Sequence, residues 1–209
     1  MAKLLHVSAS PRGEQSESLA VASAFVEVYR ESHPGDVVEH WDLWDGALPA
    51  FGPVATAAKM AVIRGDEPTG EQVAVWREVV AAVERFTSAD RLLFSVPMWN
   101  SGIPYVLKQF VDVVSQPGMV FGVDVETGYL PLLAGRGKRA AVVYTSSIWG
   151  PEVAPGFGAD FQSTYFDNWL RWAGITDVTE IRHHPTLTGD VEDSRQTALA
   201  TAREVAKTF

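Results

Sequence analysis

Four serines within an eleven-residue stretch are the first residues in this chain that could bind a ligand. Ser8, Ser10, Ser16 and Ser18 separate an apolar run from a helical pattern. Hydroxyls and backbone N–H groups at the start of a helix suit a phosphate dianion, because the positive end of the helix dipole faces it. The only glycine between these serines is Gly13. That excludes both the dinucleotide G-x-G-x-x-G fingerprint and a Walker loop, and it favours a mononucleotide phosphate.

A plain structural role for these serines is the alternative. Ser16 or Ser18 can cap the following helix, and the other two can solvate a turn. Their position at the first strand-to-helix junction favours the phosphate, because this junction is where mononucleotide phosphates bind in doubly wound sheets.

A second candidate segment runs from Pro97 to Gly102 and contains Met98, Trp99 and Asn100. A thioether and an indole can pack on the faces of a flat tricyclic ring, while Asn100 and backbone N–H groups can bond its polar edge. The alternative is that the Met and Trp belong to the core and the Asn forms a turn. Proline and glycine keep the segment in a loop, which favours a flavin-binding role.

The elements that position these loops follow from hydrophobic periodicity. We predict five strands, at residues 3–7, 36–41, 91–96, 138–144 and 178–183. We predict helices at residues 18–31, 71–86, 104–114, 161–173 and 193–207, a short helix near 54–62, and a long loop or hairpin over 118–135. Alternation of this kind predicts one α/β domain over residues 1–209, with a doubly wound, five-stranded parallel sheet and helices on both faces. Ligands of such sheets bind beyond the carboxyl ends of the strands, so the loops after the first, third and fourth strands face the site.

Composition narrows the class of ligand. The net charge of −9 and the lack of a Lys/Arg cluster argue against nucleic-acid binding. No stretch approaches the roughly 18–20 apolar residues of a membrane span, and no secretory signal is visible, so we expect a cytoplasmic protein with no membrane partner. The absence of cysteine removes disulfides, thiol nucleophiles and thiolate metal sites. We therefore expect a small-molecule site without a metal.

Two sequence blocks resemble the FMN-dependent NADH azoreductases, which belong to the flavodoxin-like NAD(P)H quinone reductase superfamily. The blocks are Ser8-x-Ser10-Pro-Arg with Ser16-x-Ser18, and Pro97-Met-Trp-Asn-x-x-Ile-Pro-x-x-Leu107-Lys108-x-Phe110-x-Asp112. The resemblance covers essentially the whole chain. It implies a flavodoxin-like homodimer that binds FMN and transfers hydride by a ping-pong cycle from NADH or NADPH to a quinone or azo compound.

The resemblance also implies roles for individual residues. Ser10 and the turn Ser16-Glu17-Ser18 match the phosphate site, and Met98, Trp99, Asn100 and Ser101 match the isoalloxazine loop. The second position of that loop is usually tyrosine in the family, so Trp99 is a mild change.

The turn after the fourth strand departs from the family pattern. Ser146 matches the usual Ser-Arg-Gly-Gly, but Ser147, Ile148 and Trp149 replace the Arg-Gly-Gly. We expect main-chain groups at Ser146 and Ser147 to keep the FMN contact and Trp149 to reshape the acceptor pocket.

Two further aromatic residues match positions that wall the substrate cavity in the family. Phe121 is one, and Trp169, expected to reach across the dimer, is the other. Trp169 and Trp172 lie three apart on one helical face, so a core role for Trp169 is the alternative.

No side chain is required as an acid or a nucleophile, because the flavin carries the chemistry. Protons come from solvent, and Tyr144 or the hydroxyls of Ser146 and Ser147 are candidates to assist. Adjacent His183 and His184 point to opposite faces of an extended strand, so we assign them to the surface. Two other functions remain open: a flavodoxin-type electron carrier, and a dimeric scaffold that has lost its flavin.

Overall fold

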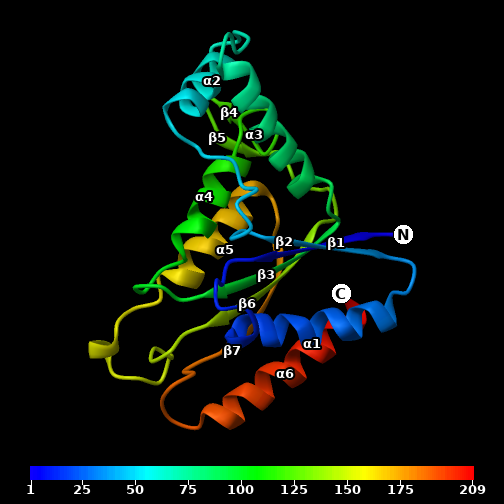
Figure 1. The fold of residues 1–209 in the computed structure, drawn as a ribbon, viewed down its shortest axis with the longest axis vertical. Helices are drawn as coiled ribbons and strands as arrows, with labels where there is room; N and C mark the ends of the chain where they lie inside the picture. The colour runs from blue at the N-terminus through cyan, green and yellow to red at the C-terminus, as the bar shows by residue number, and fades with distance from the viewer.

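A five-stranded parallel sheet forms the centre of the molecule in the computed structural model, which describes residues 1–209. Its strand order is β2-β1-β3-β6-β7 (Figure 1). The bounds are Lys3–Ser8 for β1, Val37–Asp42 for β2, Arg91–Pro97 for β3, Arg139–Thr145 for β6 and Asp177–His183 for β7. The strand order reverses between β1 and β3, which is where doubly wound sheets bind ligands. The predicted fold class is confirmed.

Helices cover both faces of this sheet. Helices α1 (Glu17–Ser32) and α6 (Val191–Thr208) pack side by side on one face (Figure 1). Helices α3 (Gln72–Thr87), α4 (Tyr105–Val114) and α5 (Gln162–Ala173) cover the other face. None of the helices is long and apolar enough to cross a membrane.

Successive side chains along each strand point to opposite faces of the sheet, so they fill two separate hydrophobic cores. Along β3, Leu92 and Phe94 point to the side of α3, α4 and α5, whereas Leu93 points to the side of α1 and α6. Both faces are apolar because both are covered, so a continuous apolar run marks each central strand.

The long segment predicted as a loop or hairpin is a hairpin. Strands β4 (Phe121–Asp124) and β5 (Gly128–Pro131) pair antiparallel and lie outside the main sheet, near α2 (Pro53–Ile63) (Figure 1). Two short 3-10 helices, η1 (Gly13–Gln15) and η2 (Pro155–Phe157), lie in the loops after β1 and β6.

Candidate functional site

The loops after β1, β3 and β6 leave the sheet side by side. Strand β3 pairs in parallel with both β1 and β6. Main-chain bonds continue this alignment into the loops, with Ala9 N donating to Ser95 O at 3.0 Å and Met98 N donating to Thr145 O at 2.7 Å. The three segments singled out from sequence are therefore neighbours at one edge of the sheet.

The serine loop presents donors at the start of α1. Ser10, Ser16 and Ser18 are all buried. Ser16 caps α1 by accepting from Leu19 N at 3.3 Å, and its hydroxyl lies 3.1 Å from that of Ser18. The amides of Glu17 and Ser18, in the first helical turn, donate to no group of the chain. Helix capping by a serine and anion binding by the same turn are thus compatible. The Ser16 hydroxyl orders the turn and leaves the amides of Glu17 and Ser18 free to bind an anion.

The side chain of Glu17 turns away from these donors. Its Oε2 accepts from Arg195 Nε on α6 at 3.1 Å and lies 3.6 Å from His183 Nε2. Only the main chain of Glu17 therefore remains available to a ligand at the start of the helix. Arg195 could not be predicted as part of this site, because nothing along the chain indicates that α6 packs against the start of α1.

The loop after β3 is a tight turn that exposes two amides. Trp99 and Gly102 exchange main-chain bonds of 2.8 and 2.9 Å. Between them, Asn100 and Ser101 both have positive φ, at 49° and 68°. Two adjacent non-glycine residues in this region are uncommon, and their amides donate to no group of the chain. Unpaired donors held in a strained turn are typical of a ligand site.

A cluster of three aromatic side chains supports this loop. The sequence did not predict that they lie together. The ring of Trp99 lies 5.8 Å from that of Trp44 and 6.1 Å from that of Tyr105, between centroids. Trp44 follows β2, and its Nε1 donates to Ala9 O in the loop after β1 at 3.0 Å. Met98 and Trp99 are half-buried. They belong to the loop rather than to the core.

The turn after β6 also presents free amides. Residues 147–150 donate no main-chain hydrogen bond. Ser146 Oγ donates to the carbonyl of Trp149, and Thr186 N donates to Ser146 O at 2.9 Å. The segment after β7 therefore holds this turn in place while its amides remain open. Ile148 is exposed and Trp149 is half-buried.

Tyr144 does not reach this edge as a proton donor. Its side chain is fully buried, and its hydroxyl donates to Asp167 Oδ1 on α5 at 2.6 Å. Burial raises the pKa of Tyr144 far above its ordinary value, and the charge of Asp167 raises it further. Burial likewise raises the pKa of Asp167, to about 6. This burial and this hydrogen bond argue against the expectation that Tyr144 assists proton transfer and favour a structural role.

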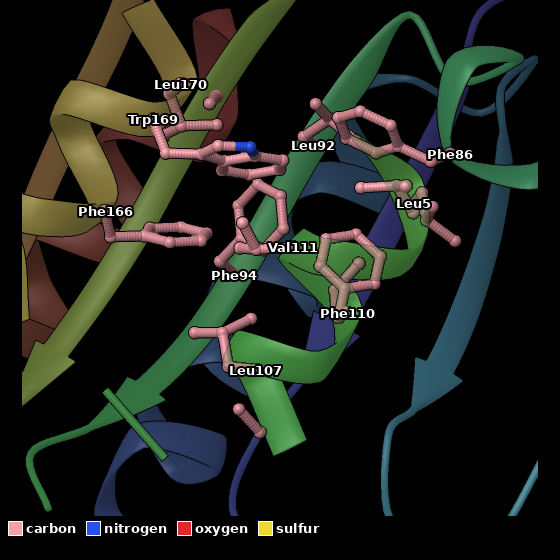
Figure 2. Close-up of a cluster of buried hydrophobic side chains, with 14 of the residues drawn as sticks. Leu5, Phe86, Leu92, Phe94, Leu107, Phe110, Val111, Phe166, Trp169 and Leu170 are labelled. Atoms are coloured by element: carbon pink, nitrogen blue, oxygen red, sulfur yellow. The ribbon is translucent and has the colours of Figure 1, made fainter. Parts of the chain in front are cut away.

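Trp169 lies in the core instead of lining a pocket. It packs among Phe86, Phe94, Phe110 and Phe166, between the sheet and helices α3, α4 and α5 (Figure 2). Its Nε1 donates to a hydroxyl at the end of α4 at 3.0 Å. Core packing thus accounts for the position of Trp169, in agreement with the alternative that it is a core residue.

Phe121 lies on β4, apart from the three loops. It packs against Tyr129 and Trp172, with ring centroids 5.6 and 5.1 Å away. It borders a cavity of about 350 Å³ between α2 and the hairpin, which no residue of the three loops lines.

The expectation that His183 and His184 lie on the surface is wrong. His183 is completely buried and its Nδ1 lies 2.9 Å from Ser194 Oγ. Both ring nitrogens of His184 are buried without a hydrogen-bond partner. The strand end is covered by the start of α6 and by the turn after β6, which the sequence pattern did not reveal. No group of three or more His, Asp or Glu side chains is arranged to hold a metal ion.

Two cavities lie near these loops. One of about 520 Å³ adjoins the loop after β3 and is lined by Gly102, Ile103, Lys108, Phe161, Thr164, Tyr165 and Asn168. A larger one of about 730 Å³ lies beside α1 and is lined in part by the stacked rings of His6 and His40. None of its lining residues is among those predicted to bind a ligand.

Known proteins resemble this chain along nearly its whole length. The family described as having a flavodoxin-like fold matches residues 2–207. An FMN-dependent NADH:quinone oxidoreductase of Ruegeria pomeroyi is 46% identical over 203 residues, covering 96% of this chain and 98% of that protein. One of Nitratidesulfovibrio vulgaris is 41% identical over 212 residues and covers all of both chains.

Solved structures agree with these relatives. An azoreductase from Bacillus anthracis superposes with a TM-score of 0.89 at 26% identity, over the full length of both chains. An FMN-dependent NADH-azoreductase from the same species, in complex with FMN, gives a TM-score of 0.89 at 25% identity and covers 99% of this chain and 98% of that one.

Proposed function

Since this chain belongs to the flavodoxin-like fold family and, within it, to the FMN-dependent NADH:quinone oxidoreductases, we propose that it binds FMN and reduces a quinone or an azo compound. The electron donor is NADH or NADPH, and the two half-reactions follow a ping-pong order. One observation carries the proposal: three neighbouring loops at the switch point of the sheet present main-chain amides that no group of the chain accepts.

The start of α1 fits a phosphate group. It combines the unpaired amides of Glu17 and Ser18 with the hydroxyls of Ser10, Ser16 and Ser18, and the helix dipole adds partial positive charge there. Such a donor set favours a dianion, and the Glu17 side chain points to α6, where its carboxylate accepts from Arg195.

The other two loops fit a flat, polar-edged ring. The amides of Asn100 and Ser101, and those of residues 147–150, can donate to ring carbonyls and nitrogens, while Met98 and Trp99 lie beside them for packing. When bound, FMN would supply hydride acceptance from the nicotinamide and two-electron reduction of the acceptor. The chain supplies orientation, packing and donors toward the negative charge that a reduced flavin carries.

No buried acid of the chain takes part in proton delivery. The candidate hydroxyl of Tyr144 is buried and bonded to Asp167, whereas Ser147 is exposed at the turn after β6. Solvent therefore provides the protons that the reduced acceptor requires.

We also propose that the protein is a homodimer. Large apolar side chains remain exposed near the loop after β3 and on the β4–β5 hairpin: Tyr105, Phe157, Phe161, Val123, Val125, Tyr129 and Leu130. Apolar area of this kind supports a protein interface. Sedimentation equilibrium measures the oligomeric state, and a monomer at micromolar concentration would contradict the proposal.

Absorbance spectroscopy tests the proposed activity directly. The purified protein is mixed with FMN, reduced anaerobically with NADH, and then given a quinone. Bleaching by NADH followed by recovery with the quinone supports both half-reactions. A stable one-electron reduced form without NADH oxidation would indicate an electron carrier instead. Failure to bind added FMN would indicate a scaffold and would refute the site at all three loops.

A further inference from the structure

An acidic residue stands in the middle of the proposed phosphate turn. Glu17 lies between Ser16 and Ser18 and is the first residue of α1. A carboxylate in the first turn of a helix is favourable in itself, but it repels a phosphate dianion that binds to the same turn. The turn can accept the dianion only if this negative charge is compensated.

The compensating cation comes from the far end of the sequence. Arg195 lies in α6, 178 residues after Glu17, and its Nε donates to Glu17 Oε2 at 3.1 Å. Because α1 and α6 pack side by side on the same face of the sheet, a side chain of α6 can reach the start of α1 (Figure 1). The two terminal nitrogens of Arg195 donate to no group of the chain.

The neighbouring imidazole does not supply this charge. His183 Nε2 lies 3.6 Å from Glu17 Oε2, but the ring is completely buried and this nitrogen has no hydrogen-bond partner. Burial lowers the pKa of His183, and the positive charge of Arg195 opposes its protonation as well, while the charge of Glu17 favours it. Arg195 is therefore the positive charge beside Glu17 at neutral pH.

We infer that Arg195 determines specificity for the phosphorylated flavin: by holding and neutralising the Glu17 carboxylate, it allows the serine turn to bind a phosphate dianion. The inference rests on the proposed function and assigns its selectivity for FMN over riboflavin to one ion pair. Riboflavin has the same ring and no phosphate, so the pair should not affect its binding.

Binding titrations of the flavin-free protein, followed by flavin fluorescence, test this inference without an activity assay. Arg195→Gln should raise the Kd for FMN by about tenfold and leave the Kd for riboflavin within twofold, as expected for one uncompensated charge near a half-exposed site. Arg195→Lys keeps the charge and should stay within threefold of the wild type for both ligands. Arg203→Gln is the matched control, because it removes one positive charge from an exposed position of the same helix.

The double variant Glu17→Gln/Arg195→Gln separates compensation from direct binding. Removing both charges should restore FMN affinity to within threefold of the wild type. If the double variant binds FMN as weakly as Arg195→Gln, or if Arg195→Gln weakens both flavins equally or neither, the inference is wrong. Wild-type protein that binds no FMN at all would instead refute the proposed function, so the two failures are distinguishable.

Discussion

The indole ring of Trp149 lies edge-on against the imidazole of His184, with centroids 5.4 Å apart and planes at 62°. This contact joins the turn after β6 to the segment after β7. Both ring nitrogens of His184 are buried beneath it without a partner. The indole of Trp149 is therefore packed against the protein and Ile148 is exposed, while the amides of residues 147–150 stay unpaired.

Replacing this indole should change the acceptor pocket more than flavin binding. In Trp149→Ala we expect the KM for a bulky acceptor, such as an azo dye, to change at least threefold relative to that for a small benzoquinone. The Kd for FMN should stay within threefold, because the expected flavin contacts are main-chain amides. Steady-state kinetics and flavin titration measure the two effects. Ile148→Ala, which removes an exposed side chain of the same turn, is the control and should change neither value.

Removing the buried phenol hydroxyl should affect stability and leave turnover intact. In Tyr144→Phe the Asp167 carboxylate loses the donor now 2.6 Å away, which we expect to lower the free energy of unfolding by about 2 kcal/mol. Turnover per bound flavin should equal that of the wild type. Asp167→Asn retains an acceptor for Tyr144 and removes the buried charge, so it should be less destabilising at pH 7. A large loss of turnover in folded Tyr144→Phe would restore a catalytic role.

Truncating the core indole should destabilise the fold severely. Trp169 is 5% exposed and packs among four phenylalanine rings, so Trp169→Ala should lower the free energy of unfolding by about 3–5 kcal/mol in chemical denaturation (Figure 2). Trp169→Phe fills much of the space and should cost less. A role in the acceptor pocket would appear differently, as a raised KM for the acceptor in a Trp169→Phe protein of nearly normal stability.

Mild acid should destabilise the protein through His6. Its Nε2 lies 2.6 Å from Ser95 Oγ in the sheet, and burial, together with the charge of His40, lowers the pKa of His6 from 6.5 to about 3. The folded state thus binds the proton less readily than the unfolded state. The stabilising contribution is complete above pH 6.5 and is lost as the pH falls toward 3.

Denaturation at two pH values measures this contribution. Between pH 7.5 and pH 5 the wild type should lose about 2 kcal/mol more unfolding free energy than His6→Gln, since one pH unit corresponds to about 1.4 kcal/mol for one proton. Equal losses in the two proteins would show that His6 is protonated in the folded state or that it opens to solvent.

The local pattern of apolar and polar residues was sufficient to predict the strands, the helices and the position of the three loops. Apolar runs of five to seven residues at the central strands, and helical spacing between them, predicted all five strands of the sheet within one or two residues of their observed bounds. The rule that ligands bind beyond the carboxyl ends of the strands then brought Ser16, Asn100 and Ser146 to one edge. These inferences succeed because periodicity and strand polarity are properties of contiguous residues.

Side-chain partners could not be predicted in the same way. Glu17 and Arg195 are 178 residues apart, Trp44 joins the loops after β1 and β3, and His183 is buried by the start of α6. Each of these contacts depends on which helices share a face of the sheet and how the chain returns to it. The sequence by itself therefore determined the elements, the doubly wound sheet and the three loops. Only the tertiary structure decided which side chains point toward the site and which are buried, because packing between elements distant in sequence sets that direction.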